Sequence, residues 1–241
     1  EVTYYICIRS SADAYCITSD TLITMSNGTS EKVQNINIGD LVKTWDFETG
    51  TFSIKPVIYI EKSEPMLYQR INVEFDDGTF FGIIGQHTLF DMNARNYFVI
   101  EVSTINKSIG KTVMAIDDNG NLSSKVITNI DVYEEYGSVY EIVTAYDMNF
   151  ISNGVVSAEG MIIKQTFFDL DENYKYDQEL KEKDIESYGL FTYEEFSDVL
   201  TLEQFELLNG KYFKVGLGKG YYSLDFIYYM INRFKTTGGT E

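Results

Sequence analysis

The chain has 241 residues, of which 15% are aromatic and only two are prolines. This composition is typical of a folded protein that is long enough to bury a substantial core. Its formal net charge of −18 leaves no basic surface for nucleic acid or for an anionic membrane, so neither is expected as a partner.

The first residues contain both cysteines of the chain, Cys7 and Cys16. Two cysteines are too few for a disulfide framework or a cysteine-based zinc site, so no metal is expected. Neither a signal peptide nor an apolar run of membrane-spanning length is recognisable. The chain starts at Glu1, with the strand-like residues 2–8 and no initiator methionine. We therefore expect a part of a longer protein, with residues 1–15 as an N-terminal flank belonging to that host.

Residues 16–159 have the pattern of short strands separated by tight turns. Turn signals that end in glycine, which supplies the positive φ of tight hairpins, occur at 26–28, 48–50, 76–78 and 118–120. Segments rich in β-branched and aromatic residues lie between them, at 67–75, 79–84, 126–132 and 139–144. No long segment has the 3.6-residue period of an amphipathic helix, so the pattern predicts an all-β domain.

Residues 160–241 differ in character and predict a smaller, mainly α-helical region. Thr192 and Thr201 are each followed three residues later by an acid or an amide, which is the arrangement of a capping box. The second box leads into an apolar run that is expected to end at Asn209-Gly210. Ser223 is expected to cap a third helix, because apolar residues follow it at helical spacing. We assign this region to the host protein.

The acidic segment 169–177 has the ligand spacing of the first half of a calcium loop. Its oxygen donors would be Asp169, Asp171 and Asn173. The sixth position of the loop is not glycine and the twelfth is not glutamate. A solvated acidic turn is therefore the better interpretation.

Three motifs in the predicted β-domain carry candidate chemistry. The first is Cys16 with the residues that follow it (CITSDTLI), and the second is segment 84–90 (IGQHTLF), which contains His87, the single histidine. The third spans residues 139–156 and contains Glu141. A thiol is mostly protonated at pH 7 and an amine is a poor leaving group, so a thiol needs a nearby imidazole to attack an amide.

In order and spacing these motifs resemble those of the Hint domain superfamily, which comprises inteins, bacterial intein-like domains and hedgehog autoprocessing domains. The resemblance covers residues 16–159 and implies a horseshoe-like, pseudo-two-fold β-domain whose ends come together. It implies that Cys16 is the nucleophile that attacks the Tyr15–Cys16 bond, that His87 activates this amide, and that Glu141 is an acid or base near the junction. Such self-processing needs no metal or organic cofactor, and its substrate is the flanking polypeptide itself.

The sequence also departs from the family pattern. Ile84 replaces the usual threonine of the second motif, and Met148 replaces a frequent histidine of the third. At the C-terminal junction, the usual histidine, asparagine and nucleophile are replaced by Ala158, Glu159 and Gly160. A carboxylate is a poor substitute for the asparagine amide that cyclises, and glycine has no side chain to accept an acyl group.

The retained and the lost residues support two hypotheses from different classes. In the first, the domain cannot splice but retains an N–S acyl shift at Cys16, followed by N-terminal cleavage or acyl transfer. In the second, the fold is catalytically inactive and serves as a structural or assembly module of a larger protein, such as a phage virion component or a secreted multidomain protein. In both we expect other domains or subunits of the host as partners, and the virion or the cytoplasm as the location.

Overall fold

The computed structural model describes residues 16–158, 170–212, 219 and 224–236. Fourteen strands lie in the first of these segments: β1 (Ile17–Thr18), β2 (Leu22–Thr24), β3 (Ser30–Lys32), β4 (Leu41–Asp46), β5 (Thr51–Lys62), β6 (Met66–Phe75), β7 (Phe80–Ile84), β8 (His87–Asp91), β9 (Asn96–Ile100), β10 (Thr112–Ile116), β11 (Leu122–Gly137), β12 (Val139–Thr144), β13 (Asn149–Ser152) and β14 (Val155–Ala158). The later segments contain α1 (Gln178–Tyr188), α2 (Leu202–Leu207) and α3 (Leu224–Thr236). The predicted fold class, mainly β with a mainly helical C-terminal region, is confirmed.

The turns predicted from glycine signals connect consecutive strands. They join β2 to β3, β4 to β5, β6 to β7 and β10 to β11, and each glycine has a positive φ. The four segments predicted as strands correspond to β6, β7, β11 and β12. β11 is longer than predicted at both ends, because it pairs with β6 along its C-terminal part and with β10 along its N-terminal part.

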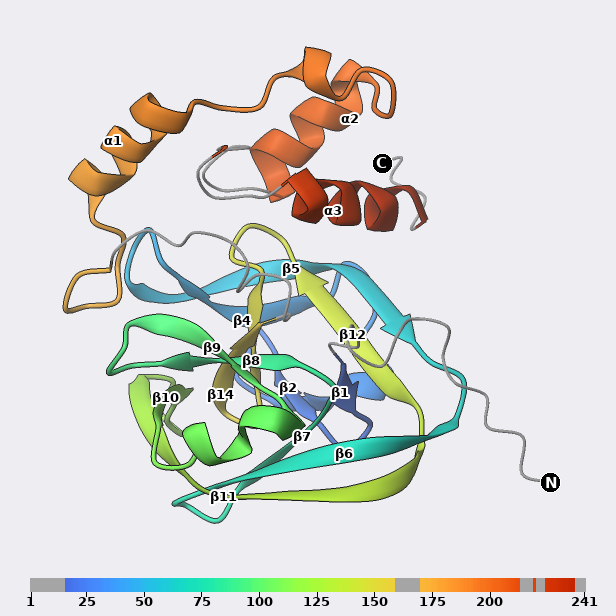
Figure 1. Cartoon of the computed structure of the whole chain (residues 1–241), viewed down its shortest axis with the longest axis vertical. Coiled ribbons are helices and arrows are strands. Elements are labelled where there is room, and N and C mark those ends of the chain that lie inside the picture. Colours follow the sequence, from blue (N-terminus) through green and yellow to red (C-terminus); the bar gives the residue numbers. More distant parts are fainter. Residues whose placement is uncertain (1–15, 159–169, 213–218, 220–223, 237–241) are drawn as a thin grey trace.

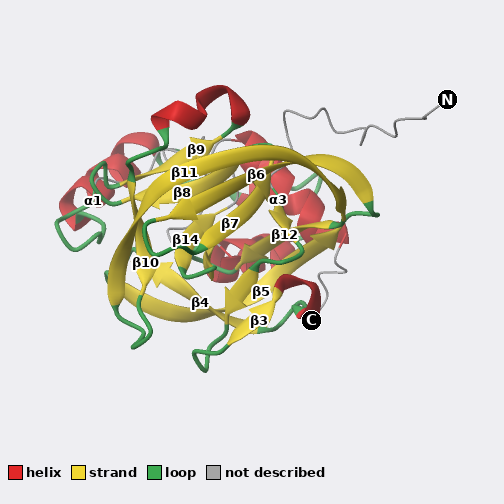
Figure 2. Cartoon of the chain, turned by 90° about the horizontal axis from the view of Figure 1, so that it is seen from below, coloured by secondary structure: helices red, strands yellow, loops and turns green. Residues whose placement is uncertain are grey.

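The strands form a strongly curved antiparallel sheet (Figure 2). The longest ladder joins β6 to β11, with β7 beside β6 and the short β1 beside β7. β1 also pairs with β12, which in turn pairs with β5. In the other part of the sheet, β14 pairs with β13 and with β8, and β13 reaches β2. The first and the last strands of the domain are therefore both interior members of the sheet.

Side chains from nearly every strand form the core of the β-domain. Ile17 of β1, Ile83 of β7 and Phe150 of β13 belong to one buried cluster and are at most 2% exposed. Burial of a large apolar side chain stabilises a fold by about 1.5–3 kcal/mol. The two ends of the domain are thus anchored in the same core.

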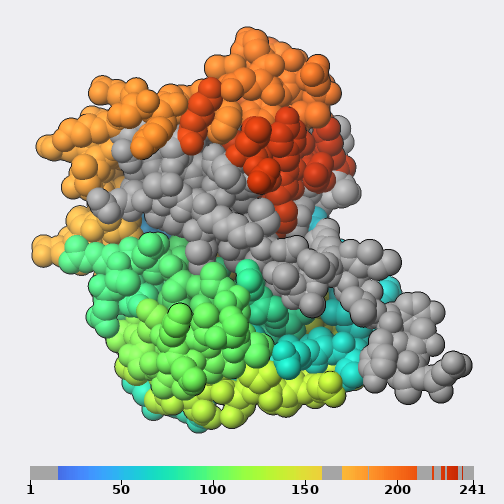
Figure 3. Space-filling model, in the orientation of Figure 1, coloured from blue at the N-terminus to red at the C-terminus, as the bar shows by residue number. Residues whose placement is uncertain are grey.

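The C-terminal helices lie on one side of the β-domain, next to β5 and β12 (Figure 1). In the space-filling view they form the upper part of the molecule, and the strands form the lower part (Figure 3). Both predicted capping boxes are present, one at Thr192 and one at Thr201. α1 begins after Asp177, whose carboxylate accepts a hydrogen bond from the Leu180 N–H at 3.1 Å.

The end of α2 differs from the prediction. Instead of stopping at Asn209-Gly210, the chain continues through a wider π-helical turn, Leu208–Tyr212. Leu208, the first residue of this turn, is buried at 1% exposure. The third predicted helix is α3, which begins directly after Ser223; Ser223 itself lies outside the described residues. Among the described residues, the short 3-10 helices are η1 (Val33–Asn35), η2 (Val102–Lys107) and η4 (Tyr193–Glu195).

The helices and the β-domain share one hydrophobic cluster. The strands and their connections contribute Trp45, Phe47, Tyr59, Phe90, Tyr97, Met114, Val143, Met148, Ile151, Val156 and Ala158. The C-terminal region contributes Leu170, Phe196, Leu200, Phe205, Leu208, Ile227, Met230 and Ile231. Among the described residues, no helix is both long enough and apolar enough to span a lipid bilayer.

Candidate functional site

Cys16 lies directly before β1, where the described chain begins. Its carbonyl oxygen accepts a hydrogen bond from the Ile84 backbone N–H at 3.0 Å. The half-buried side chain packs against a small apolar cluster formed by Tyr68, Ile84 and Val139. Both the backbone and the side chain of the candidate nucleophile are therefore held by neighbouring strands.

His87 is the first residue of β8 and is 1% exposed. It follows a short connection from β7, in which Gly85 has a φ of +61°. This turn separates His87 from the end of β7 and places it at the start of the next strand. The imidazole packs edge to face against Phe81, with ring centroids 5.5 Å apart. This packing fixes the plane of the ring.

The two ends of the β-domain meet at the β7–β8 connection. Ile84, at the end of β7, donates a hydrogen bond to Cys16, and Thr88 in β8 pairs with Ala158 at the end of β14. Along the chain, only the turn and His87 lie between these two contacts. One short segment therefore contacts the first and the last residues of the described β-domain.

Glu141 lies in β12, the strand that pairs with β1. The ladder pairs Tyr140 with Ile17, and the same register continued by one residue would place Glu141 opposite Cys16. Glu141 is 5% exposed and accepts a hydrogen bond from the Tyr229 hydroxyl of α3. It thus lies beside the strand that follows the cysteine and in contact with the C-terminal helix.

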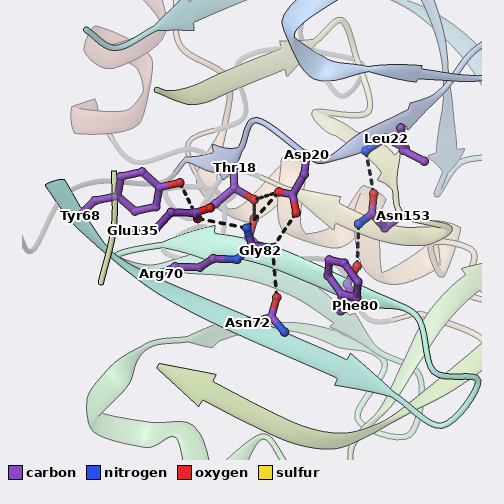
Figure 4. Close-up of polar contacts among 10 residues, drawn as sticks. All are labelled: Thr18, Asp20, Leu22, Tyr68, Arg70, Asn72, Phe80, Gly82, Glu135 and Asn153. Atoms are coloured by element: carbon purple, nitrogen blue, oxygen red, sulfur yellow. Dashed lines mark hydrogen bonds and ion pairs between the residues drawn. The ribbon is translucent and has the colours of Figure 1, made fainter. Parts of the chain in front are cut away.

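A buried arginine that is absent from the sequence motifs contacts the segment that follows Cys16 (Figure 4). Arg70 in β6 is 4% exposed and forms ion pairs with Asp20 at 2.8 Å and Glu135 at 3.1 Å. Asp20 also accepts a hydrogen bond from the Thr18 hydroxyl at 2.5 Å, and Glu135 accepts one from the Tyr68 hydroxyl at 2.8 Å. We call these five residues the Arg70 network. It joins the beginning of the domain to β6 and β11.

Burial and pairing both act on the protonation of this network. Burial alone would raise the pKa of Asp20, but hydrogen bonds from Arg70 and Thr18 outweigh it and hold the pKa below its usual value. Burial opposes the charge of Arg70, yet hydrogen bonds to Asp20 and Glu135 raise its pKa. Burial and then the hydrogen bond to Glu135 raise the pKa of Tyr68. At neutral pH, Asp20 and Arg70 are therefore ionised and Tyr68 is a neutral donor.

Two asparagines of the third motif have structural contacts. The fully buried Asn149 accepts a hydrogen bond from the Trp45 N–H at 2.7 Å and donates one to the Trp45 carbonyl at 2.9 Å. Asn153 accepts one from the Leu22 N–H at 2.7 Å and donates one to the Phe80 carbonyl at 2.6 Å (Figure 4). The first asparagine joins β13 to β4, and the second joins the β13–β14 turn to β2 and β7.

The acidic segment before α1 forms a turn around Asp171. Its carboxylate accepts hydrogen bonds from the backbone N–H groups of Asn173 at 2.7 Å and Lys175 at 3.1 Å. Among the residues that the structure describes, no three or more histidine, cysteine, aspartate or glutamate side chains group together as metal ligands. Like Ser223, the residues Cys7, Tyr15, Glu159, Gly160 and Asp169 lie outside the described ranges.

No family model matches the sequence, and no curated protein matches it either. The structure, however, is similar to solved intein structures. For the DnaB intein from Synechocystis sp. PCC 6803, the TM-score is 0.50 at 12% identity over 60% of this chain and 97% of the intein. For the PabCDC21-1 intein, the TM-score is 0.51 at 16% identity over 61% and 99%. For a variant of the Ssp DnaB mini-intein, it is 0.50 at 11% identity over 60% and 93%. The β-domain of this chain therefore has the Hint fold of the inteins.

Proposed function

We propose that this chain is an intein-like self-processing domain that carries out an N–S acyl shift at the Tyr15–Cys16 bond and cannot splice. One observation carries the proposal: the two ends of the Hint fold meet at the β7–β8 connection, with His87 between the backbone contacts of Cys16 and Ala158. This arrangement puts a thiol and an imidazole on adjoining segments, as attack on a backbone amide requires.

In the proposed reaction, the Cys16 sulfur attacks the carbonyl carbon of Tyr15. The peptide C–N bond breaks, the thiol proton passes to the departing nitrogen, and residues 1–15 become joined to the cysteine as a thioester. We assign the protonation of this nitrogen to His87, because imidazole titrates near neutral pH and acid–base assistance contributes about a hundred- to ten-thousand-fold. Water or an added thiol would then release residues 1–15.

Glu141 is assigned as a further acid or base near the junction. Its place in β12, in register with the segment that begins at Cys16, supports this assignment. The hydrogen bond from Tyr229 would orient the carboxyl group.

The far junction lacks the groups that splicing needs. Ala158 pairs with Thr88 at the end of β14 and has no side chain that could assist cyclisation. Glu159 offers a carboxylate where an amide is needed, and Gly160 offers no nucleophile. The proposal is therefore restricted to the N-terminal half of the reaction.

Thiol-induced cleavage tests the proposal directly. The full chain, tagged at both ends, is incubated with and without dithiothreitol, and the products are identified by intact mass. We expect thiol-dependent release of residues 1–15, which Cys16→Ala abolishes and the control Cys7→Ala leaves unchanged. An intact wild-type chain under all conditions would refute self-processing.

The same assay tests His87. We expect His87→Ala to slow the release by at least about tenfold, the lower range of acid–base effects. Circular dichroism at the assay temperature must show that the variant is folded, because the ring also packs against Phe81. An unchanged rate would limit His87 to a packing role.

A structural or assembly module is the second candidate function. It is favoured by the contact of Tyr229 with Glu141 and by the hydrophobic cluster that α3 shares with the β-domain. In such a module Glu141 would serve to dock the helix. Thiol-induced release separates the two candidates, because an inactive module releases nothing. In an active domain, Tyr229→Phe tests Glu141: it should change the cleavage rate if Glu141 assists the chemistry, and only the thermal stability if Glu141 merely docks α3.

A further inference from the structure

We propose that Arg70 is a positioning residue for Cys16. Through one carboxylate it holds the segment that follows the cysteine, and through a second it holds Tyr68, a member of the small cluster against which the cysteine packs. The inference rests on the proposed function, because the placement of the sulfur matters for chemistry only if Cys16 reacts.

The first arm of the network supports a strand that is short of backbone bonds. β1 has only two residues, Ile17 and Thr18, and pairs with β7 at a single position. Both nitrogens of the Arg70 fork bind the Asp20 carboxylate, at 2.8 and 3.2 Å. The Thr18 hydroxyl lies 2.5 Å from Asp20 and 3.0 Å from the Gly82 carbonyl. These contacts fix the chain on the C-terminal side of the cysteine.

The second arm reaches the side chain of the cysteine. Arg70 pairs with Glu135 of β11, which also accepts the Tyr68 hydroxyl (Figure 4). The Tyr68 side chain is 8% exposed and belongs to the small cluster that contacts Cys16. Both arms therefore start from one guanidinium group. One reaches the backbone segment that follows Cys16, and the other reaches the cluster against which the Cys16 side chain packs.

Charge gives this geometry a measurable consequence. Titratable side chains on the elements around Cys16 include Asp20 after β1, Tyr68 and Arg70 on β6, His87 on β8, Glu135 on β11, and Tyr140 and Glu141 on β12. Arg70 compensates two of the carboxylates. Removal of the guanidinium would leave their negative charge uncompensated, which disfavours a thiolate nearby.

The test compares two buried cations in a Cys7→Ser background, where Cys16 is the remaining thiol. Arg70→Met is compared with Lys125→Met, because the two pairs match in exposure. The Arg70–Asp20 side chains are 5% and 45% exposed, and the Lys125–Asp77 side chains are 13% and 44% exposed. Asp77 lies in the β6–β7 turn, at the opposite end of the hairpin from Ile84. Thiol-induced release and the pH profile of iodoacetamide labelling are measured where circular dichroism shows both variants folded.

We expect Arg70→Met to slow the release by at least about tenfold and to shift the midpoint of the labelling profile upward by about one pH unit. Lys125→Met should leave the release rate within about twofold of the wild-type rate and the labelling midpoint close to that of the wild type, as expected of a substitution away from the site. Equal effects of the two substitutions at equal folded fraction would overturn the inference. Arg70→Lys should restore the charge and part of the midpoint shift, but not the fork that fixes the segment.

A milder variant keeps the inference falsifiable if Arg70→Met does not fold. Asp20→Asn affects a half-exposed side chain and should slow the release by about threefold, the range for loss of one paired charge. An unchanged rate would overturn the inference. If the wild type itself releases nothing, the proposed self-processing is wrong, but the labelling profile still tests Arg70. An unchanged midpoint of the labelling profile in Arg70→Met would overturn the positioning role. If Arg70→Met is unfolded, an unchanged midpoint in Asp20→Asn would overturn it.

Discussion

Gly82 shows at the scale of single atoms how tightly the Arg70 network is packed. A Cβ atom at this position would lie 2.3 Å from the Thr18 Oγ1 atom and 2.5 Å from the Arg70 Nη2 atom. Both neighbouring side chains are buried and hydrogen-bonded, so neither can move away without loss of its partners. Glycine is therefore required here by close approach.

We expect Gly82→Ala to lower the free energy of unfolding by about 1–3 kcal/mol, the usual cost of overpacking. Gly137→Ala is the control, because its new Cβ would meet nothing nearer than Tyr68 at 3.9 Å. Alanine in that strand should be neutral or stabilise it by up to about 1 kcal/mol. Urea denaturation of both variants measures the difference, and equal destabilisation would contradict the packing argument.

Asp20 gives the network a pH dependence. Its pKa in the folded protein lies below the usual 3.8, mainly because the hydrogen bonds from Arg70 and Thr18 outweigh burial. A lowered pKa stabilises the folded state above pH 3.8, and this contribution is lost as the pH falls through the folded pKa. We expect Asp20→Asn to destabilise the protein at pH 7 and to have less effect near pH 3.

Urea denaturation at the two pH values measures this effect of Asp20. In an Arg70→Met background the pH dependence of the substitution should largely disappear, because the main stabilising partner is gone. If the free energy of unfolding differs between wild type and Asp20→Asn by the same amount at pH 7 and at pH 3, the lowered pKa of Asp20 is contradicted.

At the scale of strands and turns, local sequence signals were sufficient for the hairpins. Glycine turns and alternation predicted β6, β7 and β12 because these features depend on neighbouring residues. Cys16 comes directly before β1 and His87 is the first residue of β8, so each of these motifs marks the start of a strand. Arg70 carried no comparable signal, since its partners Asp20 and Glu135 are far away in the sequence. Contacts of that kind depend on the three-dimensional pairing of strands.

Asn149 also connects elements that are distant in the sequence. Its side chain satisfies the N–H and the C=O of Trp45 in β4 and also donates to the Asp147 carbonyl at 3.0 Å. Truncation to alanine would leave buried backbone groups without partners, at about 1–3 kcal/mol for each group. Asn153, by comparison, is only half-buried, so water can replace part of its hydrogen bonding.

We therefore expect Asn149→Ala to lower the free energy of unfolding by about 2–4 kcal/mol. Asn153→Ala, the matched substitution at the other asparagine of the motif, should cost about 1–2 kcal/mol. Thermal and urea denaturation of the two variants give the comparison. A larger loss at Asn153 would show that the β13–β14 turn, and not the β4–β13 connection, limits the stability of the fold.

At the scale of the whole molecule, the helices complete the core of the β-domain. Trp45 is 1% exposed, and its Nε1–H donates to the Tyr174 carbonyl at 3.2 Å. The Tyr146 hydroxyl donates to the Gly210 carbonyl at 2.7 Å. Sequence composition changes near residue 160, but the apolar faces on both sides of that change belong to one cluster. Composition marks a change of secondary structure, and it carries no information about which buried faces meet.

The shared cluster predicts that the β-domain and the helices unfold together. Trp45 is the single tryptophan, so its fluorescence reports on their interface, while circular dichroism at 222 nm reports mainly on the helices. We expect the two urea transitions to coincide, because removal of the helices would expose the apolar face that contains Trp45.

Ile231→Ala, at 1% exposure, should shift both transitions by about 2–5 kcal/mol. Leu202→Ala, at 51% exposure, should shift neither by more than about 0.5 kcal/mol. Two separate transitions, with only the helical one sensitive to Ile231→Ala, would instead mean that the Hint fold is stable without its C-terminal cover.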